Sequence, residues 1–175
     1  MASPADSETW MTLVVQPNDT NPLGTLHGGR LLYWMDECSS IAATKHSRAV
    51  VVTVSVDGVS FRHAIELGSV VTIRARVTRT FRTSMEVFVE VWAENIPRNQ
   101  RIKCNEAYYT FVALDERKQP LVVPDVVPTN EEERRLFDGA MRRRQLRLIL
   151  AGKLKAEDAD ALRALFMPEN PDSKK

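Results

Sequence analysis

The sequence predicts an α+β fold in which a curved antiparallel sheet wraps around one long central helix. Two observations lead to this prediction: a single long apolar helical pattern begins at Gly28, and strand-like patterns stand on both sides of it along the chain. Most connectors between the strand-like runs are short, which is typical of antiparallel hairpins. A sheet must bury its apolar face, and this helix is the one candidate to cover it.

The first expected elements are a strand at residues 8–16, where apolar and polar side chains alternate, and a turn-rich loop at 17–24. The helix is expected from Gly28 to about Thr44. Its apolar residues follow a helical spacing. One stripe is formed by Leu31, Met35, Cys38 and Ala42, and further residues make the helix apolar over much of its circumference: Leu32, Trp34, Ile41 and Ala43. Such a pattern indicates a helix that is enclosed by other structure.

Four strands are expected after the helix, at residues 50–61, 70–81, 85–92 and 106–114. The run at 50–61 is β-branched and nearly continuous, which predicts a central strand covered on both faces. In the next strand the inward side chains are expected to be Val71, Ile73, Ala75 and Val77. One helix covers only part of such a sheet and leaves its edges open, so association with another copy is expected.

The character of the chain changes after Pro128, which divides it into a domain at 1–128 and a C-terminal helical extension at 129–175. The segment Thr129-Asn-Glu-Glu132 has the pattern of a capping box. Acidic residues fill the first turn of the helix that follows, and arginines fill its later turns, as the helix dipole favours. A second short helix is expected at 156–166, and the chain from Met167 onward is expected to fray.

The composition indicates a globular protein in a reducing compartment. The chain has 175 residues, of which 43% are hydrophobic and 27% charged, and its net charge is +1. Its cysteines, Cys38 and Cys104, stand far apart, and its three histidines lack the spacing of a zinc motif. No signal peptide or transmembrane stretch is visible. We therefore expect a cytoplasmic protein with no metal, no nucleic-acid partner and no membrane insertion.

The most informative segment joins a turn, a glycine pair and a carboxylate. Asn21 begins the turn, Gly28 and Gly29 open the helix, and Asp36 follows seven residues after the pair. Glycines at a helix start leave backbone N–H groups accessible, and the helix dipole favours developing negative charge there. Asp36 is expected to lie where water is limited, and a carboxylate in such a place is functional or paired. Hydrolysis of an activated acyl group requires such an oxyanion site and carboxylate.

Several blocks stand in a recognisable order: N-x-x-G-x-x-H-G-G-x-L-x-x-x-M-D-E at 21–37, Val-Val-Thr-Val-Ser-Val-Asp at 51–57, Phe61, Arg-Thr-Ser-Met at 82–85 and Tyr-Thr-Phe-Val-Ala-Leu-Asp at 109–115. Together they resemble the acyl-CoA thioesterases of the hotdog fold, above all the brain-type cytosolic acyl-CoA hydrolases and their single-domain bacterial relatives. The resemblance runs from about residue 9 to 128, and the tail after Pro128 lies outside it.

The resemblance implies a role for each matching residue. The amides of Gly28 and Gly29 polarise the thioester carbonyl, Asp36 acts as general base or nucleophile, and Asn21 orients the attacking water or the carbonyl, with His27 in support. Two further groups are implied to bind substrate or CoA: Thr53 and Phe61, and the turn Arg82, Thr83 and Ser84, where Phe81 stands in place of the usual glycine.

Each of these residues also has a plainer interpretation. Asn21 is a common turn residue, a glycine pair often just ends a loop, Asp36 would pair with an arginine on a wet helix face, and Arg82 and Ser84 would be ordinary hairpin residues. Basic residues that are candidates to meet the CoA phosphates are Arg62, His63, Arg98, Arg101 and Lys103.

Helix geometry adds that the site is shared between two chains. Seven residues of α-helix rise about 10 Å, at 1.5 Å per residue, so Gly29 and Asp36 of one chain are too far apart to act on one carbonyl. Two antiparallel helices from two copies would bring them together. A dimer is then the minimum assembly, and a trimer of dimers, a hexamer, is common among similar proteins.

The leading interpretation is an acyl-CoA hydrolase that needs no cofactor, since CoA is part of its substrate. A hotdog-fold hydratase or dehydratase that uses His27 with Asp36 is an alternative. The other alternative is a non-catalytic acyl-CoA-binding module that uses the same groove.

Overall fold

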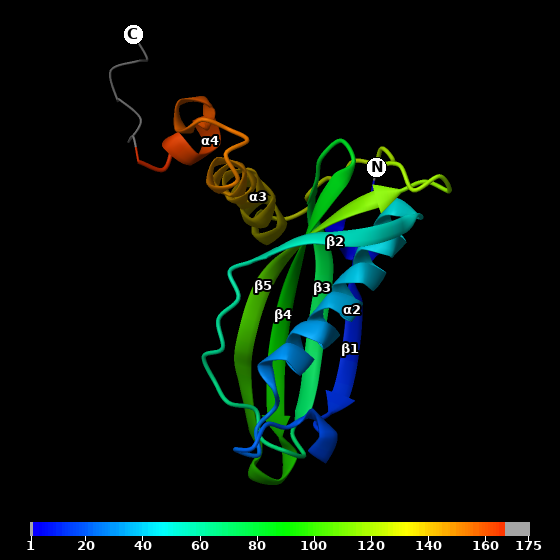
Figure 1. Ribbon diagram of the computed structural model, residues 1–175. Coiled ribbons are helices and arrows are strands. Elements are labelled where there is room, and N and C mark those ends of the chain that lie inside the picture. The colour runs from blue at the N-terminus through cyan, green and yellow to red at the C-terminus, as the bar shows by residue number, and fades with distance from the viewer. Residues whose placement is uncertain (1, 167–175) are drawn as a thin grey trace. The chain divides into compact units, whose positions relative to one another are not determined.

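The structure is a computed structural model of the protein and describes residues 2–166. The chain divides into two compact units, Met1–Thr129 and Asn130–Lys175. The first unit contains a five-stranded antiparallel sheet and a long helix, α2 (Gly28–Ser47). The sheet curves around this helix (Figure 1). The predicted α+β fold, an antiparallel sheet wrapped around one helix, is confirmed.

The strands occur in the order β1-β3-β4-β5-β2 across the sheet. Their bounds are Thr9–Val14 for β1, Val50–Asp57 for β2, Val70–Thr80 for β3, Ser84–Asn95 for β4 and Gln100–Leu114 for β5. Short helical segments lie at α1 (Pro4–Ser7), η1 (Pro17–Asp19) and η2 (Ile96–Arg98). Because β3, β4 and β5 are joined by tight hairpins, their registers are fixed over most of their length.

The core lies between the concave face of the sheet and α2. All four side chains expected to point inward from β3 are fully buried, and so are Met35, Cys38 and Ala42 on the inner side of α2. Each large apolar side chain buried in this way stabilises the fold by about 1.5–3 kcal/mol. The prediction that other structure encloses the helix is therefore confirmed for one side of α2. The helix is also longer than predicted and continues three residues beyond Thr44.

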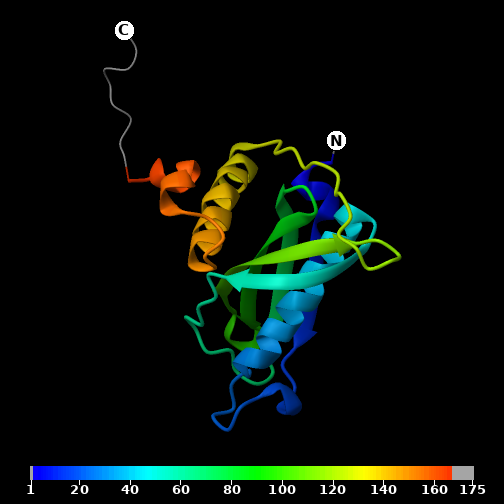
Figure 2. The same ribbon diagram turned by 45° about the horizontal axis from the view of Figure 1, so that its top comes forward.

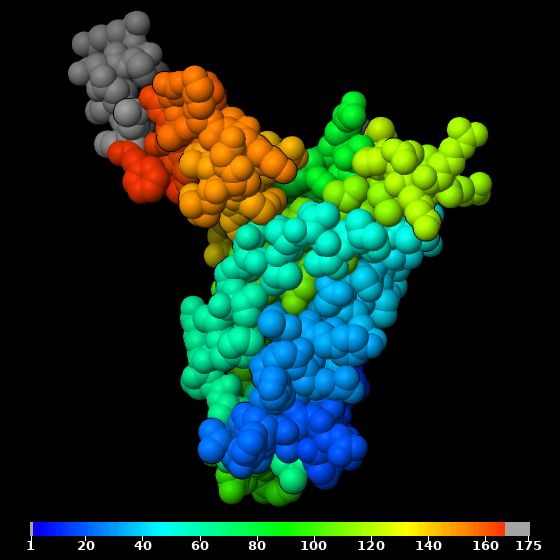
Figure 3. Space-filling view, in the orientation of Figure 1, coloured from blue at the N-terminus to red at the C-terminus, as the bar shows by residue number. Residues whose placement is uncertain are grey.

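The prediction that residues 50–61 form a central strand is wrong. β2 ends at Asp57 and occupies the edge of the sheet, where it pairs with β5 alone among the described strands. Its valines Val50, Val52, Val54 and Val56 are between 40% and 70% exposed. A continuous β-branched run shows that both faces of a strand tolerate apolar contact, but it does not show which strand stands beside it. In Figure 3 this edge, in cyan, lies beside α2, in blue.

The second unit begins with α3 (Glu131–Leu150) and continues through η3 (Ala156–Asp158) to α4 (Asp160–Arg163), which packs beside α3 (Figure 2). The N-cap of α3 is Asn130, whose Oδ1 accepts the N–H of Glu133 at 2.9 Å. The capping box expected at Thr129 is thus displaced by one residue, because asparagine caps a helix at least as well as threonine. The fraying expected from Met167 onward lies outside the described residues.

Candidate active site

The loop before α2 is held together by the side chain of Asn21. Its Oδ1 accepts the N–H groups of Leu23 at 2.9 Å and Thr25 at 3.3 Å, and its Nδ2 donates to Thr25 Oγ1 at 2.9 Å. Asn21 therefore has the turn-forming role that such a residue commonly has. Its side chain is thereby fixed in place in the lining of the pocket that the loop helps to form.

His27 caps the start of α2. Its Nδ1 accepts the N–H of Gly29 at 3.1 Å, while the N–H of Gly28 has no acceptor among residues 2–166. One of the two predicted glycine donors is therefore occupied in this conformation and the other is open. This contact was not predicted from the sequence, although a residue with a side-chain acceptor directly before a helix is the usual signal for a cap.

A pocket of about 360 Å³ forms around Gly28. A Cβ atom at Gly28 would lie only 3.2 Å from Cζ of Phe61, so the glycine allows the aromatic ring to lie against the helix start. The lining residues are Asn21, Thr25, Leu26, Gly28, Leu31, Phe61, His63, Ala64 and Ile65. The structure thus brings three predicted site residues, Asn21, Gly28 and Phe61, into one pocket.

Asp36 is paired with Thr53, which reaches it from the neighbouring strand β2. Thr53 Oγ1 donates to Asp36 Oδ1 at 2.7 Å, and Oδ2 has no protein partner among residues 2–166. Nearby, Tyr109 donates its hydroxyl to the carbonyl of Leu32 at 3.2 Å. Burial raises the pKa of Tyr109, and the negative charge of Asp36 raises it further, so this hydroxyl stays protonated.

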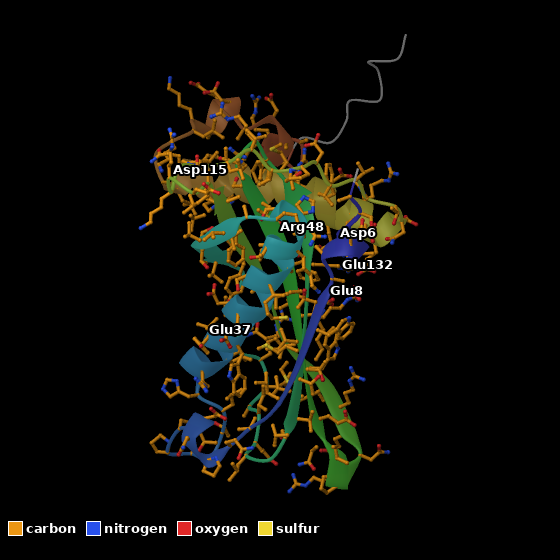
Figure 4. The ribbon with its side chains drawn as sticks, turned by 90° about the vertical axis from the view of Figure 1, so that its right-hand side faces the viewer. Asp6, Glu8, Glu37, Arg48, Asp115 and Glu132 are labelled. Carbon is orange, nitrogen blue, oxygen red and sulfur yellow. The ribbon has the colours of Figure 1, made fainter. Side chains whose placement is uncertain are left out.

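The expectation of limited water around Asp36 is wrong for a single chain. Asp36 is half-buried, Tyr33 one turn before it is 51% exposed, and Ile41 beyond it is exposed as well. Met35 and Cys38 face the core, but on a helix Asp36 points about 100° away from Met35 and about 160° away from Cys38. Tyr33 donates to Glu37 at 2.8 Å, which supports a structural role for Glu37. Figure 4 labels Glu37 on this helix and Arg48 at its far end.

One chain does not bring the two halves of the site together. The helix α2 is continuous from Gly28 through Asp36, so the rise of about 10 Å between Gly29 and Asp36 remains. The turn Arg82–Ser84 is also distant from Gly28. Its carbonyls accept from Ala113 and Val123, beside the strand ends at the C-terminal end of α2, whereas Gly28 is at the other end (Figure 1).

The predicted basic candidates differ in how far they are already paired. Arg98 contacts Glu66 at 3.3 Å, and Lys103 contacts both Glu90 and Glu106 at 2.9 Å. The guanidinium of Arg101 lies over the ring of Trp92 at 5.8 Å.

In the described part of the chain, no three His, Cys, Asp or Glu side chains are grouped as a metal site would require, and no helix is long and apolar enough to span a membrane.

Sequence comparison finds relatives that cover most of the chain. Residues 23–98 match the family model described as the thioesterase superfamily. The uncharacterized acyl-CoA thioester hydrolase YkhA of Bacillus subtilis is 40% identical over 138 residues, which cover 79% of this chain and 80% of that protein. The cytosolic acyl coenzyme A thioester hydrolase of Rattus norvegicus is 37% identical over 134 residues, 75% of this chain. The matched region spans only 35% of the rat protein's own length.

Solved structures with the same fold extend the comparison. An acyl-CoA thioesterase solved as an apo-hexamer has a TM-score of 0.82 and 40% identity, covering 85% of this chain and 96% of that chain. The acyl-CoA hydrolase of Staphylococcus aureus in complex with butyryl coenzyme A, coenzyme A and coenzyme A disulfide has a TM-score of 0.78 and 34% identity. That likeness covers 95% of this chain and 99% of the other, so it continues beyond Pro128, where the resemblance was expected to end.

The Staphylococcus aureus hydrolase has also been solved with three residues, an Asn, an Asp and a Thr, each replaced by alanine. In that chain the Asp lies 15 residues after the Asn, and the Thr lies 17 residues after the Asp. Asn21, Asp36 and Thr53 have the same residue types at the same spacing. Two of these three residues are the hydrogen-bonded pair, and the third lies in the pocket at Gly28.

Proposed function

Because the chain belongs to the acyl-CoA thioester hydrolases of the thioesterase superfamily, we propose that it hydrolyses acyl-CoA to a free acid and CoA. The resemblance to hotdog-fold acyl-CoA thioesterases and the fold that it implies are confirmed. The observation that supports the proposed reaction most directly is the hydrogen bond between Thr53 and Asp36. It fixes a carboxylate at the spacing that the Staphylococcus aureus hydrolase shares.

In the proposed mechanism Asp36 acts as a general base. Thr53 holds Oδ1, which leaves Oδ2 to accept a proton from water as the water oxygen attacks the thioester carbonyl carbon. The carbonyl oxygen becomes negative and accepts the N–H of Gly28 at the positive end of the helix dipole. The C–S bond then breaks, the acid is released, and the CoA thiolate takes up the proton that Asp36 accepted.

Gly28 supplies the first oxyanion donor, and Gly29 becomes available when its N–H leaves Nδ1 of His27. The hydrogen bond between them is 3.1 Å long, at the weak end of the range for N–H donors. A developing oxyanion is a stronger acceptor than a neutral imidazole nitrogen, because hydrogen bonds to charged groups are about twice as strong. His27 thus supports the site by capping the helix while no oxyanion is present. Asn21 shapes the same pocket and lies where it can orient the carbonyl.

We propose that the working site combines Gly28 of one copy with Asp36 of another. Three observations support this: the rise of about 10 Å along α2, the exposed side of α2 around Asp36, and the exposed valines of β2 beside it. The hexameric thioesterase that the chain resembles is consistent with a dimer or a trimer of dimers. The turn Arg82, Thr83 and Ser84 would then contact CoA that is bound to a neighbouring copy.

The proposed reaction uses protein groups and water, and it requires neither a metal nor a cofactor apart from the CoA of the substrate. A cytoplasmic location is also proposed, which the name of the rat relative supports. Membrane insertion and nucleic-acid binding are no part of the proposal.

The experiment that tests this function measures thiol release from acyl-CoAs of increasing chain length, with wild type and with Asp36→Asn. The isosteric variant keeps the hydrogen bond from Thr53 but lacks the base. It is expected to lose at least about 100-fold in kcat, the lower range for general acid–base catalysis. Wild-type turnover in Asp36→Asn would refute the mechanism. An enoyl absorbance change without thiol release would instead identify a hydratase, and binding without either signal would identify a non-catalytic module.

A further inference from the structure

A second, smaller pocket adjoins the pocket at Gly28. Its volume is about 210 Å³, and it is lined by Arg62, His63, Lys103, Cys104, Asn105 and Glu106. His63 also lines the Gly28 pocket, so the two pockets meet at this side chain. A ligand bound at Gly28 therefore has a second set of polar groups within reach.

This pocket exists because β2 leaves the sheet before β5 ends. The pairing of β2 with β5 stops at Asp57 and Tyr108, so residues 100–107 of β5 pair with β4 alone among the described strands. The segment after Asp57 then runs along this side of β5 and contributes Arg62 and His63 (Figure 1). A β-bulge at Cys104 separates Asn105 from Lys103, and bulges commonly re-aim side chains beside functional sites.

Asn105 is the informative residue in this pocket. It is only 4% exposed, and neither its Nδ2 nor its Oδ1 has a hydrogen-bond partner in the protein. A buried amide without partners destabilises the free protein, because both of its polar ends have lost their hydrogen bonds to water. A ligand with a donor and an acceptor side by side would satisfy both ends at once.

The CoA part of the proposed substrate offers this chemistry in two places. Pantetheine contains secondary amides, each with one N–H and one C=O, and the adenine ring presents a donor–acceptor edge that asparagine pairs with in two hydrogen bonds. Positive charge beside Asn105 suits an anionic ligand of this kind. Lys103 is neutralised by Glu90 and Glu106, whereas only the Nε of Arg62 is engaged, at 3.3 Å from Ser60 Oγ.

We propose that Asn105 binds the CoA part of the substrate, pairing its side-chain amide with a pantetheine amide or with the adenine edge. The inference rests on the proposed function, since it takes acyl-CoA as the ligand. Asn105 is then a binding residue for substrate and takes no part in proton transfer. Replacing Asn105 is therefore expected to raise KM for acyl-CoA and the Kd of CoA and to leave kcat nearly unchanged.

The test replaces Asn105 by leucine, which has nearly the same shape and no polar atoms. Loss of the paired hydrogen bonds is expected to raise KM for acyl-CoA about tenfold, with kcat within about twofold, as the loss of one to two net hydrogen bonds implies. The Tm of the free protein is expected to stay level or rise, because an unpaired buried amide has been removed. A fall in Tm together with an unchanged KM would show that Asn105 is structural and overturn the proposal.

Thr110→Val is the matched control. Thr110 is on the same strand, is also 4% exposed and also carries a buried hydroxyl without a partner, but it lines none of the pockets described above. This variant is expected to leave KM for acyl-CoA unchanged. Equal KM changes in the two variants would mean that the strand, rather than the amide of Asn105, is responsible, and would also overturn the proposal.

Three substrates with the same acyl group locate the contact. If Asn105 binds a pantetheine amide, Asn105→Leu raises KM for both acyl-CoA and acyl-pantetheine. If it binds adenine, the substitution raises KM for acyl-CoA alone. An acyl ethyl thioester, which contains neither group, is expected to be unaffected, and an equal loss with it would overturn the proposal. Equilibrium titration with CoA, beside the thiol-release assay, distinguishes a failure of the proposed function from a failure of the proposed role of Asn105. A wild type that releases no thiol refutes the function, whereas a Kd for CoA that is the same in wild type and Asn105→Leu refutes the role of Asn105.

Discussion

The hydrogen bond between Thr53 and Asp36 can be removed without changing the shape of the site. Thr53→Val replaces the hydroxyl by a methyl group on the same β-branched side chain and deletes the 2.7 Å contact to Asp36 Oδ1. Thr53 is exposed in the single chain, so the free energy of unfolding is expected to change by no more than about 0.5 kcal/mol. Any loss of activity then reports on the carboxylate and not on folding.

The expected loss follows from the strength of this contact. A hydrogen bond to a charged group contributes about 1.5–3 kcal/mol, and each 1.4 kcal/mol corresponds to about a tenfold change in rate. Because Thr53 is exposed and Asp36 half-buried in one chain, the lower value applies unless a second copy covers them. We therefore expect kcat to fall about tenfold, and as much as about 100-fold if the pair is covered, with KM within about threefold.

The assay is steady-state thiol release from one acyl-CoA over a range of concentrations, with thermal melts of the same preparations. Thr53→Ser is the control, since it retains the hydroxyl and is expected to keep most of the wild-type kcat. An unchanged kcat in Thr53→Val would refute the idea that this hydrogen bond orients the carboxylate. If Thr53→Ser lost as much as Thr53→Val, the methyl group would be the important part of the side chain.

Two further predictions concern assembly and stability. Gly28→Ala places a Cβ 3.2 Å from the Phe61 ring and is expected to be inactive, as is Asp36→Asn; refolding the two together should restore up to about a quarter of wild-type activity, because half of the dimers are hybrids with one intact site each. No recovery in the mixed sample would refute a shared site. Separately, burial raises the pKa of Glu8 but hydrogen bonds from Trp10 and Arg74 outweigh it, and the net pKa lies below the ordinary value of 4.5. The ionised carboxylate therefore stabilises the fold above about pH 4.5 and this contribution is lost as the pH falls through the lowered pKa. Glu8→Gln should be about 0.5 kcal/mol less stable than wild type at pH 7 and equally stable near pH 2, and a difference that persists at pH 2 would contradict the assignment.

Periodicity in the sequence was sufficient to predict which side of α2 and of β3 is buried. Met35, Cys38 and Ala42 share one helix face, and Val71, Ile73, Ala75 and Val77 share one strand face, because the side-chain period of each element fixes these sets. The order of strands across the sheet is not encoded in this way. The apolar run of β2 therefore predicted a covered strand, although β2 lies at an edge.

The site was predicted in its residues but only partly in its contacts. The glycine pair and Asp36 follow from local chemistry, and Thr53 and Phe61 from the order of the family blocks. The cap that His27 forms on Gly29 depends on a rotamer, and the unpartnered amide of Asn105 depends on where β2 leaves β5. The position of His27 directly before the helix was a signal for a cap that was not used, whereas nothing in the sequence indicates the unpartnered amide, since the strand expected at 106–114 began one residue too late to include Asn105.

The valine-rich edge strand β2 has a consequence for the solubility of newly synthesised chains. In a newly folded chain, the outer edge of β2 pairs with no other described strand, and its main-chain N–H and C=O groups are flanked by exposed valines. Any other extended segment can compete with the correct partner for these groups. The proposed assembly must therefore form faster than misassociation, and dilution that dissociates it is expected to lower the apparent stability of the fold. Overproduction is expected to favour insoluble material whenever chains accumulate faster than they find one another.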